Sequence, residues 1–304
     1  MKTRILIFVL MLTGVASFAQ QDAQFTQYMY NTININPGYA GSRGAMSIFG
    51  LHRTQWVGMD GAPVTNAVSV NTPINNSKLG VGLSFINDRI GPTTENAISA
   101  DVSYTIQTSE TVKLSFGIKG TANMFDLNVD KLNPSQQGDA SLQSVDKFSP
   151  NVGAGVYLHT NKYYVGVSVP AFIETNTVNA AQEEYKIYKE RINYYLIAGY
   201  VFDLSRNLKF KPALLTKVVT GAPLQIDASA NFMINNRFVL GAAYRWDAAV
   251  SAMAGFQITD GLFVGYSYDY ETTDLSQYNS GSHEIFLRFE LFSNYNKIVS
   301  PRFF

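Results

Sequence analysis

The chain has 304 residues and no cysteine, which excludes disulfides, thiolate metal sites and thiol catalysis. Its 23 basic residues balance 23 acidic ones, so the net charge gives no argument for nucleic-acid binding, which needs a basic surface, and we expect no nucleic-acid partner. Only 15% of residues are charged and 13% are aromatic, while the mean hydropathy is −0.02. This balance is typical of strands in which apolar and polar residues alternate.

Residues 1–19 have the features of a secretory signal peptide. Lys2 and Arg4 are positive, residues 5–12 are all apolar, and Ser17 and Ala19 are small residues suited to cleavage before Gln20. The apolar run is shorter than the roughly 20 residues of a membrane-spanning helix. We expect an exported chain that could enter a membrane only as a closed sheet.

The next stretch, residues 24–42, reads QFTQYMYNTININPGYAGS and is not a regular strand. Aromatic and aliphatic residues are interleaved with Gln, Thr and Asn, and Pro37 and Gly38 interrupt any regular pattern. The residues alone predict an amphipathic strap that ends in a turn.

From residue 45 to 292 the chain alternates between apolar and polar residues with the period of two that marks strands. We predict about fourteen strands, with boundaries accurate to a few residues. Their ranges are 45–57, 64–72, 78–89, 95–107, 111–124, 148–160, 163–170, 191–203, 208–218, 224–234, 237–246, 249–258, 262–270 and 282–292.

Short polar connections alternate with a second class that includes long excursions at 125–147, 171–190 and 271–281. Strict alternation predicts an antiparallel up-and-down topology with all tight turns at one end and all long loops at the other.

A soluble barrel and a transmembrane barrel both fit this pattern, and the polar face favours the membrane. With charges outward, a closed sheet of about fourteen strands would have a lumen too wide for side chains to fill. With apolar residues facing lipid, the pattern matches an outer-membrane barrel. The fold class is therefore all-β, a transmembrane antiparallel up-and-down β-barrel. The candidate lumen charges are Lys209, Lys211, Lys217, Asp227, Arg245, Asp269, Arg288 and Glu290.

Aromatic residues gather near predicted strand ends, where they could form interfacial girdles. They are Trp56, Tyr163, Tyr194, Tyr200, Phe202, Tyr244, Trp246, Tyr268 and Tyr270. The lysines at 209, 211 and 217 share one strand face, which fits either neutralisation by carboxylates such as Asp227 or an ion-selective lining.

No motif for catalysis, a cofactor or a metal is present. His52, His159 and His283 fall on three different predicted strands without metal-ligand spacing, so they read as girdle or lumen residues. In the long excursion at 171–190, Tyr185 and Tyr188 stand among charges of both signs and are candidates for an extracellular protein contact.

Residues 24–31 (QFTQYMYN) and 36–41 (NPGYAG) resemble the N-terminal signature of the PorP/SprF family of type IX secretion outer-membrane proteins. The strand series and the ending Ser300-Pro301-Arg302-Phe303-Phe304 also resemble this family. The resemblance implies a non-enzymatic component of the secretion and gliding system, with the secretion machinery and a surface cargo protein as partners. The signature positions, as candidate interaction or plug residues, are Gln24, Phe25, Gln27, Tyr28, Asn31, Asn36, Pro37, Tyr39 and Gly41.

The expected layout is a signal peptide (1–19), a periplasmic signature and plug segment (20–44), a barrel in the cell outer membrane (45–292) and a periplasmic tail (293–304). We expect a single-chain barrel in contact with outer-membrane lipid, within a larger complex and without a cofactor. Two functions remain open: a secretion component that binds other proteins, and a passive or substrate-selective pore. We expect the segment at 24–42 to enter the lumen from the periplasmic side and to narrow it.

Overall fold

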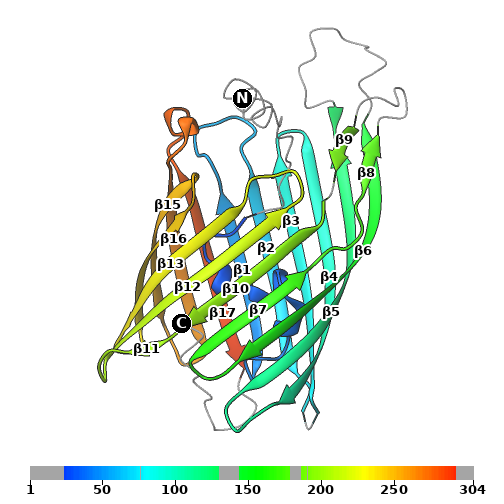
Figure 1. Ribbon diagram of the computed structural model, residues 1–304. Helices are drawn as coiled ribbons and strands as arrows, with labels where there is room; N and C mark the ends of the chain where they lie inside the picture. Colours follow the sequence, from blue (N-terminus) through cyan, green and yellow to red (C-terminus); the bar gives the residue numbers. More distant parts are fainter. Residues whose placement is uncertain (1–23, 76, 130–143, 179–185, 190, 292–304) are drawn as a thin grey trace, which may run out of the picture.

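The computed structural model describes residues 24–75, 77–129, 144–178, 186–189 and 191–291. Almost all of them form one antiparallel sheet in which each strand pairs with its neighbours in the chain (Figure 1). The first strand, β1, also pairs with the last, β17, and β10 pairs with β12. These pairings close the sheet into a barrel.

The barrel has fourteen strands, as the sequence predicts. The sheet contains fifteen segments, but β10 and β11 are separated only by Val201 and both pair with β12, so they count as one interrupted strand. The bounds are β1 Met46–Thr54, β2 Val64–Pro73, β3 Leu79–Ile90, β4 Thr93–Gln107, β5 Lys113–Leu127, β6 Val145–His159, β7 Tyr163–Val169, β10 Asn193–Tyr200, β11 Phe202–Asp203, β12 Leu208–Val219, β13 Gln225–Ile234, β14 Phe238–Arg245, β15 Ala249–Gln257, β16 Leu262–Glu271 and β17 Ser282–Leu291.

Apolar side chains point outward and most polar ones point inward, which confirms the transmembrane reading of the alternation. On β5, Phe116 and Ile118 are 46% and 65% exposed, whereas Ser115 and Lys119 are buried. A barrel with this outer face requires lipid around it, because water would meet a continuous apolar surface. Among the described residues, no helix is long and apolar enough to cross a membrane.

We name the two ends of the barrel by their connections. The turn end carries the six short connections 74–78, 108–112, 160–162, 204–207, 235–237 and 258–261, and the loop end carries the others. The expectation that all tight turns gather at one end is wrong at three places. At the loop end, only Gly91 and Pro92 join β3 to β4, residues 220–224 join β12 to β13, and residues 246–248 join β14 to β15. Glycine with φ of 54° at Gly91 allows the tight reversal.

A row of aromatic rings follows the turn end across β7, β10, β11, β12 and β13. The ring centroids of Tyr163 and Tyr200 are 6.2 Å apart, those of Tyr200 and Phe202 are 4.5 Å apart, and Phe210 and Phe232 continue the row at 4.8 Å. Three of the predicted girdle residues thus lie side by side where a lipid–water interface would favour them.

The strands at one side of the barrel are longer than predicted. β4, β5 and β6 have 15 residues each, and β5 and β6 each extend three residues further toward the loop end than the sequence indicated. Asp126, Asp146 and Lys147 interrupt the apolar alternation there, which explains the missed residues. The connection after β7 contains a separate small hairpin, β8 (Asn176–Val178) and β9 (Lys186–Lys189).

Candidate functional site

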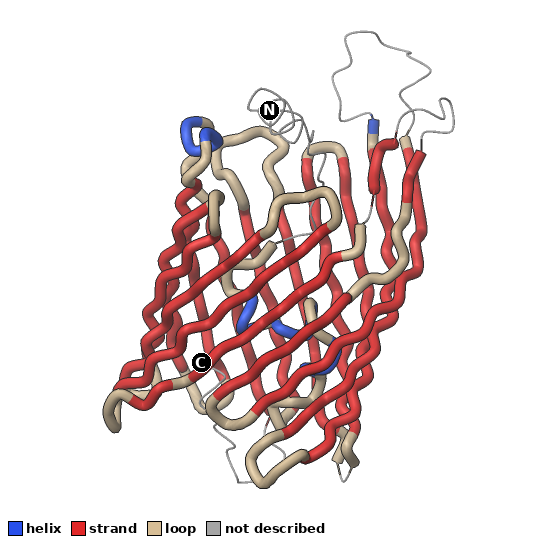
Figure 2. The backbone as a smooth tube through the Cα atoms, viewed as in Figure 1, coloured by secondary structure: helices blue, strands red, loops and turns tan. Residues whose placement is uncertain are grey.

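The segment at 24–42 lies inside the barrel, where its helical turns are visible through the wall in Figure 2. It folds into three short 3₁₀ turns, η1 (Tyr28–Tyr30), η2 (Thr32–Asn34) and η3 (Pro37–Tyr39). Proline at the first position of η3 and Asn36 before it start that turn, because the Asn36 side chain accepts a hydrogen bond from the Gly38 N–H at 2.9 Å. We call residues 24–43 the lumen segment.

The lumen segment supplies seven of the nineteen residues in the buried apolar cluster of the barrel interior, and inward-facing wall residues supply the rest. Tyr28, Tyr30, Ile33 and Tyr39 are at most 6% exposed. The Tyr30 ring packs against the rings of Phe286 and Phe263 on the last two strands, at centroid distances of 4.7 and 5.4 Å. The sequence predicted a polar inner face. That prediction is incomplete, because some inward positions carry aromatic residues, such as Phe263, that pack against the segment.

At the loop end, an ionic cluster holds the backbone of the lumen segment. Glu284 on β17 accepts hydrogen bonds from the N–H groups of Thr26 and Gln27 at 3.1 and 2.9 Å. Asp269 on β16 accepts a bond from the Thr26 hydroxyl at 2.6 Å. The Arg53 guanidinium lies 2.7 Å from Asp269 and 3.1 Å from Glu284, and all three charged side chains are at most 3% exposed.

This cluster, which we call the clamp, is a compact charge-assisted network. Two carboxylates face one guanidinium, and the backbone N–H groups of the segment provide further compensation for the negative charge. Charge-assisted hydrogen bonds in a buried site are stronger than neutral ones, and the loss of any partner leaves a buried charge unpaired. The clamp therefore couples β1, β16 and β17 to the segment.

At the turn end a second ionic contact holds the segment. Arg43 forms an ion pair with Glu290, and its Nη1 donates to the Tyr39 hydroxyl at 3.3 Å. Arg288 lies 3.5 Å from the same Glu290 carboxylate. Since Gln24 donates to Gln225 at the loop end of β13, the segment spans the lumen between the two ends of the barrel.

Between these contacts the segment lies directly on glycines of the barrel wall. The Asn36 amide donates to the Val156 carbonyl at 3.0 Å, and a Cβ added at Gly155 would collide with its Oδ1 atom. A Cβ at Gly117 would collide with the backbone of Pro37 and Gly38. Backbone can approach the wall this closely only because these wall positions carry no side chain.

Burial also affects the tyrosines of the segment, which lie outside the spanning strands. Burial raises the pKa of Tyr30 to about 12, and it raises the pKa of Tyr28 above the ordinary range. Both hydroxyls therefore stay neutral across the physiological range, as an apolar core requires.

The structure brings the predicted signature residues together in this segment. Phe25, Gln27, Tyr28, Asn31, Asn36, Pro37 and Tyr39 are buried, Gly41 has a φ of 70° against β2 and β3, and Gln24 is half-buried. Asn31 accepts a hydrogen bond from Ser69 on β2 at 3.0 Å.

All eight predicted lumen charges lie on inward-facing strand positions, but Asp227 does not neutralise a lysine. It pairs with Arg245 at 2.6 Å. Lys211 is 1% exposed and lies 5.3 Å from the Tyr30 ring centre, and Lys209 donates to Asn236 at 2.8 Å. Asp269 belongs to the clamp, and Arg288 and Glu290 belong to the ionic contact at the turn end. Lys217 is buried, and its Nζ lies 5.9 Å from the Tyr195 ring centre.

Other predicted residues lie elsewhere. His52 and His283 are exposed on the outer face and His159 is buried in the lumen. Among the residues that the structure describes, no three His, Cys, Asp or Glu side chains are placed to hold a metal ion. Tyr185 and the tail at 293–304 lie outside the described residues. Tyr188 belongs to β9, whose side chains are also not described.

Sequence reasoning missed Arg53, Glu284 and the wall glycines. Arg53 and Glu284 occupy inward positions of predicted strands, so the alternation was sufficient to mark them as lumen charges. The glycines gave no such signal, because a glycine on the polar face is equally consistent with an open lumen.

Comparison with known proteins identifies a family, and several solved structures are similar to this chain at low sequence identity. The family model described as type IX secretion system membrane protein PorP/SprF matches residues 17–289. A search of curated proteins gives no match. Among solved structures, the outer membrane protein Omp33 of Acinetobacter baumannii is 8% identical, with a TM-score of 0.49, over 81% of this chain and 98% of that one. The toluene transporter TodX of P. putida is 8% identical, with a TM-score of 0.47, over 88% of this chain and 95% of that one. The KdgM porin is 9% identical, with a TM-score of 0.39, over 81% and 99%.

Proposed function

This chain belongs to the PorP/SprF family of type IX secretion system membrane proteins, and we propose that it is a plugged outer-membrane barrel that supports the export or surface attachment of particular cargo proteins. It acts by binding proteins at its two ends and not by conducting solutes.

The observation that carries this proposal is the occupied lumen. The lumen segment contacts strands on both sides of the barrel, from β16 and β17 through β1 and β2 to β6, and its aromatic residues are buried. A barrel of this strand number leaves space that wall side chains alone do not fill, and a porin uses that space for water. Here the space holds protein, fixed by ionic contacts at both ends.

The arrangement of the connections supports a division of labour between the ends. Outer-membrane barrels have short periplasmic turns and longer extracellular loops, so the turn end faces the periplasm and the loop end faces outward. Secretion machinery on the periplasmic side would meet the turn end, and cargo would meet the long connections at 128–144 and 170–192. The tail at 293–304 is a further candidate contact for the machinery in this proposal, whereas the signature residues, buried in the lumen, act as the plug.

Planar-bilayer recordings test the plug. The intact protein and a deletion of residues 24–42 are compared after both give the heat-dependent gel shift of a folded barrel. We expect little conductance from the intact protein and a large, steady conductance from the deletion. A large steady conductance from the intact protein would overturn the plug and support the porin alternative.

A loop exchange tests the cargo role. The connections 128–144 and 170–192 are replaced by those of a relative that serves different cargo, and displayed surface proteins are compared with those of a gene-deletion strain. We expect cargo choice to follow the loops. If the deletion strain displays every surface protein but takes up a small solute more slowly, the secretion role is wrong.

A further inference from the structure

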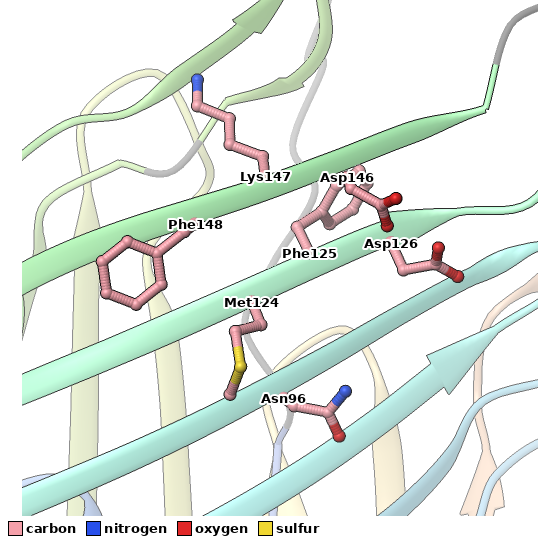
Figure 3. A pocket seen from close by; sticks show the side chains of 7 residues that line it. All are labelled: Asn96, Met124, Phe125, Asp126, Asp146, Lys147 and Phe148. Carbon is pink, nitrogen blue, oxygen red and sulfur yellow. The ribbon is translucent and has the colours of Figure 1, made fainter.

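The two ends of the barrel carry different charge. At the loop end, a hollow of about 410 Å³ beside β4, β5 and β6 is lined by Asp126, Asp146 and Lys147, so charges of both signs meet there and favour neither sign of ligand (Figure 3). At the turn end, the six short connections, counted with one residue on either side, contain three acidic residues and five basic ones. The basic residues are Lys78, Lys113, Lys162, Arg206 and Arg237. The turn end therefore favours an anionic ligand.

Two of these basic residues, Arg206 and Arg237, lie on adjacent turns. The Asn235 N–H donates to the Asn207 carbonyl at 2.8 Å, which joins the turn after β11 to the turn after β13. Both arginines are exposed, and within the described part of the chain neither of them forms an ion pair. A guanidinium is a planar fork of N–H donors that matches the oxygens of a phosphate group, so the two arginines suit a phosphate ligand.

Outward-facing rings lie beside the same two turns, at the lower left of Figure 1 around β11. The Phe210 ring centroid lies 6.2 Å from that of Phe202 and 4.8 Å from that of Phe232. Phe238 is 52% exposed, and its ring centroid lies 4.7 Å from that of Phe256. Aromatic residues form girdles where the wall of such a barrel leaves the lipid, so the turns beyond these rings lie at the level of the lipid headgroups.

We infer that this corner of the turn end binds the headgroup of an anionic phospholipid in the periplasmic leaflet. We call it the basic corner, and it consists of Arg206, Arg237 and the rings of Phe202, Phe210, Phe232 and Phe238. The arginines bind the phosphate, and the rings pack against the glycerol and the upper acyl chains. A lipid occupies both parts of the corner at once, because the rings lie on the lipid-facing side of the wall. The inference takes the orientation of the barrel from the proposed function and is independent of the cargo role.

Native mass spectrometry of the purified full chain tests the site by measuring how tightly lipids are retained. The probes are phosphatidylglycerol, which is anionic, and phosphatidylethanolamine, which is zwitterionic. The double variant Arg206→Gln/Arg237→Gln removes both cations of the basic corner. The matched control, Lys78→Gln/Lys113→Gln, removes two exposed cations from the turns after β2 and β4, at the same end of the barrel. Sodium phosphate and a poly-glutamate peptide are tested as competitors.

We expect the wild type and the control to prefer phosphatidylglycerol. The arginine variant should bind it about twentyfold more weakly, because each cation beside an anionic lipid contributes about fivefold. All variants should give the heat-dependent gel shift of the folded barrel, so that weaker binding does not reflect unfolding.

Three results would overturn the basic corner and leave the cargo role untouched. Unchanged binding by the arginine variant would show that the lipid does not contact this corner, and an equal loss in the control would show that only the diffuse charge of the turn end attracts lipid. Binding of phosphate or poly-glutamate as tight as that of phosphatidylglycerol would show that the rings contribute nothing and that the occupant is a free phosphate or an acidic protein.

Discussion

The Arg53 guanidinium on the first strand and the Glu284 carboxylate on the last lie 3.1 Å apart in the lumen, and Glu284 also binds the backbone of residues 26 and 27. One ion pair therefore joins the strands that close the barrel and holds the segment that fills it. The two residues are 231 positions apart in the chain, so this contact forms only once the ends of the sheet have met.

Removal of Arg53 should destabilise both features. In Arg53→Met the carboxylates of Asp269 and Glu284 remain buried without their cation, and the loss of one partner of a buried pair costs about 3–5 kcal/mol. We expect a lower urea midpoint for loss of the heat-dependent gel shift. Lys162→Met is the control. Lys162 lies 2.8 Å from Asp203, but the two side chains are 53% and 43% exposed, so losing this ion pair should cost little. A midpoint unchanged by Arg53→Met would contradict the clamp.

Two glycines on β5 should respond differently to the same substitution. In Gly117→Ala the new methyl overlaps the backbone of Pro37 and Gly38, and overpacking of this kind costs about 1–3 kcal/mol. In Gly120→Ala the methyl meets nothing within 4 Å. We expect limited proteolysis to cut the lumen segment faster in the first variant and at the normal rate in the second. Equal rates would mean that the wall does not support the segment at Gly117.

The outer face should reject charge according to its position along the strand. Ile118 points outward in the middle of the apolar band and is 65% exposed. Ile118→Arg places a cation in lipid, at a cost of about 2–4 kcal/mol near the bilayer midplane. Glu110→Arg, in an exposed turn, should leave the folding equilibrium in lipid vesicles unchanged. If Ile118→Arg leaves the folding equilibrium unchanged, residue 118 lies outside the membrane.

Alkaline pH should loosen the lumen segment through Tyr30. Its pKa is about 12 in the folded barrel against an ordinary value of 10, so the folded state retains the proton more strongly. The resulting stabilisation is fully present below pH 10 and is lost as the pH rises through 12. The 295 nm absorbance difference between the wild type and Tyr30→Phe should titrate near pH 12, and Tyr278→Phe, at a 69% exposed position, controls for the loss of one tyrosine. A Tyr30 difference that titrates near pH 10 would show that its hydroxyl reaches water.

The sequence by itself determined the wall of this protein. Residues such as Ile118 and Lys119 occupy opposite faces because side chains alternate along any strand, and this local rule fixed the strand number, the topology and the lipid-facing side. It failed at Asp126 and Asp146, where the strands continue beyond the apolar band and the pattern no longer distinguishes a strand from a loop.

Only the tertiary structure decided how the interior is filled. The contacts of Thr26 with Asp269 and of Asn36 with Val156 join positions 243 and 120 residues apart, and no local pattern records such distances. The reason is physical: alternation reports which face a residue occupies, whereas a plug depends on which residues meet once the sheet has closed. Gly117 and Gly155 illustrate this, since a missing side chain has no meaning until the segment that occupies its place is known.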